Sequence, residues 1–368
     1  MRARLWLVGL TVAVGLVVIS TTAAVIPDVD TAQQAPQASA PTVSGDWTAD
    51  TRDRWRDGDQ QPHIQMNLRT DGGHNRWGFS VRMDELQGLP AAARDGVAAN
   101  ARFTLSREAG TFTFTGSFDA GRGAGQFGFA PSAAYTGAMT QLGYRDLARE
   151  QVMRLAVLDV TTAFVRDLRD AGQTGLALDE LTRFRIHGVT GPVVRDLASL
   201  GYKQLAPDTL VRMRIHGASP DAIRAFQKAG LGALDPDAVV RLRIHNVTPE
   251  FIAGLKSRNY TGLDADDYTR MRIHGVTLEE IDALAAAGMR GLSADDLVRF
   301  RIHKVRPEFI REMRALGFSA ADEDDFVRMR IHKVSAEFVR EARADGAQVV
   351  TADDAVDLAI HGRRWRRR

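Results

Sequence analysis

Seven histidines recur at a constant interval of about 29 residues over the C-terminal half of the chain. Six of them end an Arg-Ile-His tripeptide and the seventh ends Ala-Ile-His; they are His187, His216, His245, His274, His303, His332 and His361. Imidazoles in such a series can serve as metal ligands, as general acids or bases, or as structural contacts that recur because the unit carrying them recurs.

Spacing argues against a shared metal site. Histidines at the same position of stacked helices would lie about 8–10 Å apart, whereas zinc holds a histidine nitrogen at about 2.0–2.1 Å. Within one unit, Asp295 and Asp296 precede His303 by seven or eight residues, which is roughly 11–12 Å along a helix.

An active site, moreover, combines different functional groups at one place, whereas this series repeats the same imidazole seven times. We therefore predict no catalytic, cofactor-binding or metal-binding residue in this series. The predicted role is structural: each imidazole closes the first helix of its unit by bonding the terminal carbonyls or the next unit.

The histidines mark six complete units of equal length, at 176–204, 205–233, 234–262, 263–291, 292–320 and 321–349. An altered unit at 147–175 has Leu158 in place of histidine, and half-units flank the series. Altered terminal copies are typical of the caps of a stacked array. Residues 132–362 are therefore predicted to form an α-solenoid of two-helix repeats.

Each unit carries start and stop signals for two short helices. Ser293 followed by Asp296 approximates a capping box for a first helix. Second helices have cap residues at their start, at Thr190, Ser219, Thr248, Thr277 and Ser335. They stop at residues that tolerate a left-handed conformation, and the predicted C-caps are Gly172, Gly201, Gly230, Asn259, Gly288, Gly317 and Gly346.

Helices of about ten residues are too short to be stable alone in water. Each second helix has one apolar stripe, such as Phe251, Ile252 and Leu255, which a single unit cannot bury, so the units must stack. The motif arginines, such as Arg299 and Arg301, are predicted to pair with acidic residues in the first turn of a neighbouring unit.

Residues 45–131 alternate apolar and polar side chains with the period of β-strands, as in Ile64, Met66 and Leu68. The GRGAG segment at 121–125 precedes a strand rather than the helix that a phosphate-binding loop requires. The pattern predicts a small antiparallel β-domain with a glycine-rich hairpin turn.

Two further histidines lie in this region. His63 and His74 have Asp59 and Asp71 nearby, but their spacing is not that of metal ligands. They are predicted to lie in surface loops.

The N-terminus carries an export signal. Arg2 and Arg4 precede an uncharged stretch from Leu5 to Ile26, and a positive flank before an apolar run directs export. Cleavage after Ala24 fits this pattern, and so does retention as an anchor, because about 20 apolar residues cross a bilayer.

Residues 1–26 are thus predicted to be a signal peptide or membrane anchor, and residues 27–44, rich in Ala, Gln and Pro, a flexible linker. The expected location is the bacterial cell envelope. The chain would either be anchored in the inner membrane, facing the periplasm, or be secreted.

Composition excludes several kinds of site. The chain has no cysteine, so disulfides, thiol catalysis and cysteine-based zinc sites are ruled out. A formal net charge of +2 argues against a nucleic-acid binder. The basic tail at 363–368 is predicted to be a solvated end, with contact to anionic lipid as the alternative.

Two segments carry a resemblance to a known repeat. RIHNVTPEFI at 243–252 and ADDLVRFRIH at 294–303 resemble the helical repeat of exported bacterial proteins of uncharacterised function. The repeat is also similar to the tails of beta-lactam-sensor-type membrane metallopeptidases. The resemblance covers about 132–362, and residues 45–131 look like the front half of the exported proteins. The chain has no HExxH motif and no multi-pass membrane domain, so no proteolytic role carries over.

Together these patterns predict an α+β protein that is not an enzyme, an envelope protein whose repeats form a scaffold for a protein partner. No cofactor, metal or nucleic acid is expected, and the N-terminal anchor would provide contact with the membrane. The alternative is a ligand-sensing or regulatory accessory protein with a small-molecule or glycan site in the β-domain, which a large apolar pocket there would favour. An enzyme would require His63, His74 and an acidic residue to converge in a cleft.

Overall fold

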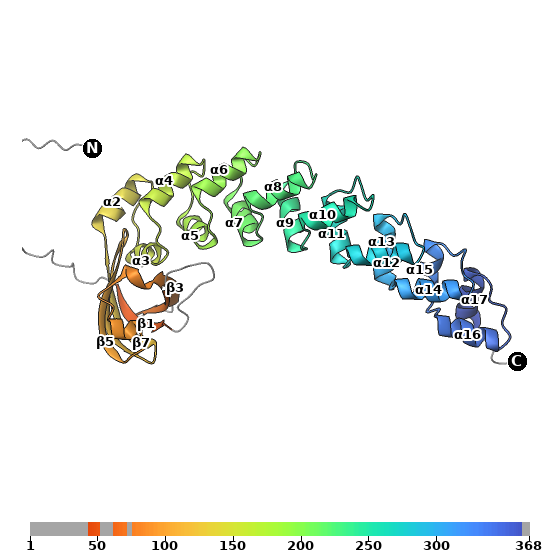
Figure 1. Ribbon diagram of the computed structural model, residues 1–368. Coiled ribbons are helices and arrows are strands. Elements are labelled where there is room, and N and C mark those ends of the chain that lie inside the picture. The colour runs from red at the N-terminus through yellow and green to blue at the C-terminus, as the bar shows by residue number, and fades with distance from the viewer. Residues whose placement is uncertain (1–42, 52–61, 72–75, 363–368) are drawn as a thin grey trace, which may run out of the picture. The chain divides into compact units, whose positions relative to one another are not determined.

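The computed structural model describes residues 43–51, 62–71 and 76–362 (Figure 1). It has an α+β layout, with a curled antiparallel sheet followed by helices in a repeat-like arrangement, so the predicted α+β class is confirmed. The predicted signal or anchor segment and the basic tail lie outside the described residues. None of the helices in the described part of the chain has the length and apolar composition of a membrane-spanning helix.

Seven described strands form one sheet in the order β3-β2-β1-β7-β6-β5-β4, with antiparallel neighbours throughout. They are β1 (Val43–Asp50), β2 (His63–Thr70), β3 (Arg76–Arg82), β4 (Leu86–Gln87), β5 (Ala99–Arg107), β6 (Gly110–Asp119) and β7 (Arg122–Pro131). The 3-10 helix η1 (Met83–Glu85) and helix α1 (Ala91–Arg94) lie between β3 and β5 along the chain. Val43 pairs with Phe129, so the sheet begins two residues before the predicted boundary at 45.

Aromatic rings form the core of the sheet. Trp47 lies 5.4 Å from Phe103 between ring centroids, and Phe103 stacks on Phe114 at 4.7 Å. Phe112 and Phe129, on neighbouring strands, are 4.6 Å apart. All five side chains are buried, as the alternating sequence pattern predicts.

Glycine is required where two strands approach each other closely. Gly116 of β6 faces Gly125 of β7. A Cβ added at Gly125 would lie 2.0 Å from the carbonyl oxygen of Thr115, and one added at Gly116 would lie 2.1 Å from that of Ala124. The hairpin turn itself is Ala120 and Gly121, both with positive φ, so the remaining glycines of the GRGAG segment belong to β7.

Helices α2 to α17 alternate between second and first helices of successive units. The first helices are α3 (Arg149–Val157), α5 (Leu178–His187), α7 (Pro207–Ile215), α9 (Pro236–Ile244), α11 (Ala265–Ile273), α13 (Ala294–His303), α15 (Glu323–Ile331) and α17 (Ala352–His361). The second helices are α2 (Ala133–Gln141), α4 (Thr162–Asp170), α6 (Gly191–Ser199), α8 (Pro220–Lys228), α10 (Pro249–Lys256), α12 (Leu278–Ala286), α14 (Pro307–Ala315) and α16 (Ala336–Ala344). First helices from α5 onward pack on one another in one row and second helices in another (Figure 1). We call helices α2 to α17 the repeat array.

The cap residues of the units stand at the helix ends. At the start of α13, Ser293 accepts a hydrogen bond from the Asp296 amide at 3.0 Å, and the Asp296 carboxylate accepts one from the Ser293 amide at 3.1 Å. Beyond the second helices, φ is positive at every predicted stop residue, from +66° at Asn259 to +98° at Gly201; these residues are Gly172, Gly201, Gly230, Asn259, Gly288, Gly317 and Gly346.

Two carboxylates connect the sheet to the repeat array. Glu108, in the turn between β5 and β6, accepts hydrogen bonds from the Thr162 amide at 3.0 Å and the Thr162 hydroxyl at 2.6 Å, at the N-terminus of α4. Asp159 pairs with Arg107 of the sheet at 3.4 Å and with Arg185 of α5 at 3.0 Å. A carboxylate at a helix N-terminus satisfies free amides and the helix dipole together.

Gly125→Ala should destabilise the protein by about 1–3 kcal/mol, because the new methyl group collides with the main chain of β6. Gly137→Ala in the middle of α2 is the matched control, since an added Cβ there has no neighbour within 4 Å. It should be neutral or add up to about 1 kcal/mol through helix propensity. Denaturant unfolding followed by circular dichroism measures both, and equal stability of the two variants would contradict the close approach of the strands.

Candidate functional site

The repeat histidines stand at the ends of the first helices. His187, His303 and His361 are the last residues of α5, α13 and α17, and the other four immediately follow their helices: His216, His245, His274 and His332. In the described part of the chain, none of the seven imidazoles takes part in a hydrogen bond or ion pair. The expected closure of the helix by the imidazole is therefore not seen.

The main chain of the histidine makes the contact instead. The carbonyl oxygen of His187 accepts a hydrogen bond from Nε of Arg214 at 3.3 Å, and that of His274 accepts one from Nε of Arg301 at 3.0 Å. Each arginine belongs to the next unit. At these two junctions the tripeptide joins adjacent units through its arginine and a carbonyl, and the imidazole makes no hydrogen bond.

The β-domain histidines do not form a site in the described residues. His63 is only 8% exposed, at the start of β2, so the prediction of a surface loop for this residue is wrong. It is held there because His63 pairs with Arg82 in the register of β2 and β3. His74 and Asp59 lie outside the described residues. No group of three or more histidine, aspartate and glutamate side chains in the described ranges is placed to hold a metal ion.

The other motif arginine pairs with an aspartate in the first turn of the next first helix, 25 residues later along the chain. This confirms the predicted pairing. The pairs are Arg154–Asp179 (2.8 Å), Arg183–Asp208 (2.6 Å), Arg212–Asp237, Arg241–Asp266 (3.1 Å), Arg270–Asp295 (2.5 Å), Arg299–Asp324 (2.6 Å) and Arg328–Asp353. The aspartates are exposed, so each pair contributes about 0–1 kcal/mol.

The arginine that precedes isoleucine adapts to its neighbour on the previous unit. Where that neighbour is phenylalanine, the guanidinium lies over the ring: Arg272 is 5.1 Å from the Phe251 centroid, and Arg330 is 5.1 Å from the Phe309 centroid. Where the same position holds Glu280, Arg301 forms an ion pair with it at 3.2 Å.

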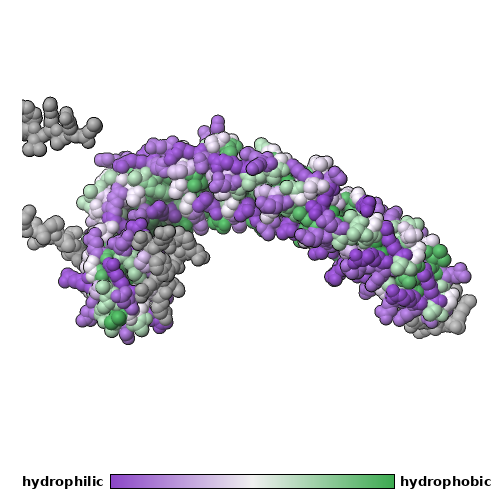
Figure 2. All heavy atoms as spheres, in the orientation of Figure 1, coloured by the Kyte–Doolittle hydropathy of each residue, from purple (hydrophilic) through white to green (hydrophobic). Residues whose placement is uncertain are grey.

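The isoleucine of the motif is exposed to solvent at every first helix from α5 to α17. The exposed fraction lies between 49% at Ile360 and 57% at Ile186. One exposed isoleucine is ordinary, but here the same position recurs on helices packed side by side, about 8–10 Å apart. We call these seven residues the isoleucine row: Ile186, Ile215, Ile244, Ile273, Ile302, Ile331 and Ile360. Figure 2 shows hydrophobic residues interspersed with hydrophilic ones over the visible face of the array.

In the first unit the same position is buried. Val157 of α3 occupies the place of the isoleucine and is 6% exposed, and Ala156 replaces the preceding arginine. Helix α3 packs against β1, β3, β6 and β7. On the same helix, the Arg154 guanidinium lies 5.9 Å from the Trp77 ring of β3. The sheet therefore rests on the helix that begins the series.

The isoleucine row was not predicted from the sequence, although isoleucine precedes the histidine in all seven copies of the motif. In α13 the buried residues are Leu297, Val298 and Phe300. Helical spacing does not show its exposure, because Ile302 lies four residues after the buried Val298 and yet is 51% exposed.

His245→Gln should leave the free energy of unfolding within about 0.5 kcal/mol of the unchanged protein, because the imidazole has no partner to lose. Arg301→Gln should destabilise it more, by about 1–2 kcal/mol, because two contacts with the preceding unit are removed. Thermal unfolding of both variants measures the difference. A larger loss for His245→Gln than for Arg301→Gln would restore the imidazole to a structural role.

No protein-family model matches this sequence, and the search of curated proteins found no match to it.

Proposed function

We propose that the protein is a non-enzymatic envelope protein whose helical repeats form an α-solenoid that serves as a scaffold for a protein partner. The isoleucine row carries this proposal. It places a half-exposed apolar side chain on each first helix from α5 to α17, in series with Val157, the position buried where α3 packs on the sheet. Repeat arrays characteristically bind partners along such extended surfaces.

The chemistry around the row indicates how a partner is recognised. The flanking arginines and aspartates neutralise each other between units, as Arg241 does with Asp266 and Arg299 with Asp324. The surface around the isoleucine row therefore has little net charge with which to bind a partner. The imidazoles, by contrast, have free donors and acceptors next to each isoleucine. A partner would present apolar side chains flanked by hydrogen-bonding groups rather than a charged patch.

The envelope location rests on the N-terminal sequence. Arg2 and Arg4 before the uncharged stretch from Leu5 to Ile26 form a signal peptide or an anchor. Either outcome exports the repeats, and the anchor would hold them beside the inner membrane. The absence of cysteine agrees with a fold that depends on packing alone.

The alternative function, a ligand site inside the β-domain, has less support. Trp47, Phe103, Phe114 and Phe118 pack against one another with ring centroids between 4.7 and 6.3 Å apart. These buried rings fill the part of the sheet's interior in which they lie. No specific observation in the described strands favours a sensing role.

Exchanging three central isoleucines for glutamine tests the scaffold. The full chain carrying Ile215→Gln, Ile244→Gln and Ile273→Gln should capture at least tenfold less of its partner, because about 1 kcal/mol or more of apolar burial is lost at each position. The measurement is quantitative mass spectrometry of proteins retained from detergent-solubilised envelope by the immobilised chain.

A variant with Val97→Gln and Val350→Gln is the matched control. These valines are 57% and 66% exposed but lie outside the row, so capture should equal that of the unchanged chain. A protein retained near stoichiometry by the unchanged chain and the control, and lost from the triple variant, is the expected result. Equal retention by all three chains, or retention by none, would refute the proposal.

A further inference from the structure

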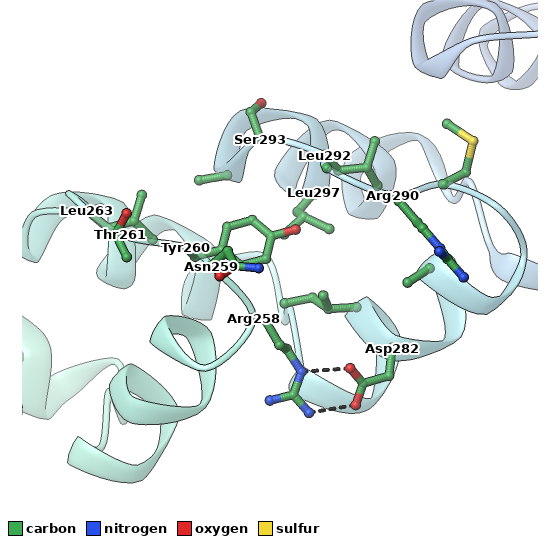
Figure 3. Close-up of a pocket in the computed structure, with 15 residues that line it drawn as sticks. Arg258, Asn259, Tyr260, Thr261, Leu263, Asp282, Arg290, Leu292, Ser293 and Leu297 are labelled. Carbon is green, nitrogen blue, oxygen red and sulfur yellow. Dashed lines mark hydrogen bonds and ion pairs between the residues drawn. The ribbon is translucent and has the colours of Figure 1, made fainter.

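A cleft of about 580 Å³ opens between the end of unit 234–262 and the two units that follow it (Figure 3). Its walls come from the loop after α10, one face of α12, the loop before α13 and the first turns of α13. This volume is within the range of about 300–1,000 Å³ that small-molecule sites have.

The cleft coincides with two departures from the repeat. Arg258 stands where six other copies have leucine or alanine, namely Leu142, Ala171, Leu200, Ala229, Ala287 and Leu316. Those residues are half-buried or buried between units. Asp282, in the next unit, stands where five copies have arginine: Arg166, Arg195, Arg224, Arg311 and Arg340.

The two departures compensate each other. Nε of Arg258 donates to one Asp282 oxygen at 2.7 Å, and a terminal nitrogen of Arg258 donates to the other at 2.6 Å. This contact lowers the pKa of Asp282 below its ordinary value. The guanidinium is directed to the side of the cleft in Figure 3. The apolar side chain that stands here in six other copies is thus absent, and the charge that replaces it is neutralised.

A tyrosine hydroxyl is left free at this gap. In equivalent positions, the Tyr144 hydroxyl donates to the Leu176 carbonyl at 2.9 Å, and the Tyr202 hydroxyl donates to the Leu234 carbonyl at 2.7 Å. Tyr260 has no such bond to Leu292 or to any other described residue. Burial raises the pKa of Tyr260, so at neutral pH the hydroxyl remains a protonated donor.

One charge that lines the cleft is not neutralised within the described chain. Arg290 has no acidic partner among the described residues, and Figure 3 places its side chain on the side of Leu292 and Leu297 opposite to Tyr260. The nearby Asp296 carboxylate forms an ion pair with Arg299 at 3.3 Å. Among the charged residues that line the cleft, Arg258 and Asp282 neutralise each other, and Arg290 leaves one positive charge.

We propose that this cleft binds a small amphipathic organic anion. Its apolar body would lie against Ile281, Leu292 and Leu297, and its single carboxylate or sulfonate would be held by Arg290. On the opposite side of these leucines, the Tyr260 hydroxyl would donate to the face of an aromatic ring at the other end of the body. A charge-assisted hydrogen bond to a guanidinium gives selectivity for an anion over a neutral molecule of the same shape. The site is separate from the isoleucine row and does not depend on a protein partner.

The probe for this site is 4-phenylbutyrate, with 4-phenylbutyramide as its neutral match, titrated into the full chain by isothermal calorimetry. Saturable binding of one carboxylate per chain is expected, with the amide at least tenfold weaker. Arg290→Ala should weaken binding of the carboxylate about tenfold. Lys203→Ala, the same position in unit 176–204, should leave it unchanged.

Tyrosine variants separate binding from folding. Tyr260→Phe should weaken the probe a few-fold without changing the melting temperature, whereas Tyr202→Phe should lower the melting temperature without changing the probe affinity.

Three results would overturn the proposal. The first is the absence of saturable binding of the probe, and the second is equal affinity for the carboxylate and the amide. The third is binding of the carboxylate by Arg290→Ala at the affinity of the unchanged chain. Any of these would make the cleft a variation in packing between units rather than a site.

Discussion

Helices of eight to ten residues, the length of every helix from α2 to α17, depend on one another because such short helices are marginal in water. Each buries its apolar residues against helices of the units before and after it. A residue at a given position of the repeat must therefore pack against helices of two neighbouring units. The leucine and alanine residues packed between units, the motif arginines and the left-handed stop residues all follow from this requirement.

The units that depart from the repeat do so where their neighbours differ. Helix α3 packs on a sheet rather than on another first helix alone, and it carries Ala156, Val157 and Leu158 in place of Arg-Ile-His. A charged side chain at Ala156 would be buried without a partner, which is costly. Across the same junction, Glu108 supplies the hydrogen bonds that the N-terminus of α4 requires. Arg258 and Asp282 also depart from the residues of other units, and here the charge of one departure neutralises the charge of the other.

Comparison of copies within one chain explains why much of the array could be predicted. Glycine in all copies but one, with Asn259 as the exception, identifies a backbone conformation, and φ is positive at each of these residues. The pairing of Arg299 with Asp324 follows from the position of opposite charges in neighbouring units. Both features recur at the same position of every unit, and the alignment of the copies therefore reveals them.

Other features depend on contacts that periodicity does not encode. A pattern of three and four residues shows which side chains share a face of a helix, but not which faces another element covers. The exposure of Ile302 and the burial of Val157 differ for that reason. The order of the strands, the burial of His63 and the contact of Glu108 with Thr162 arise from segments that meet only in the folded chain. Periodicity likewise does not show that at His187 and His274 the main-chain carbonyl, rather than the imidazole, bonds the arginine of the next unit.

Charged and apolar side chains have different roles in the array, and this difference explains which side chains are left exposed. Exposed ion pairs contribute little to stability, so the buried residues of each helix hold the units together. The arginine and aspartate pairs instead fix how each first helix stands on the next, because a bond such as Arg241 to Asp266 forms in one register only. Charges used in this way are no longer available for recognition. The isoleucine and the imidazole beside it remain free on the first helices. A surface of that composition selects a partner by shape and hydrogen bonding, which requires the regular spacing that the stacked units supply.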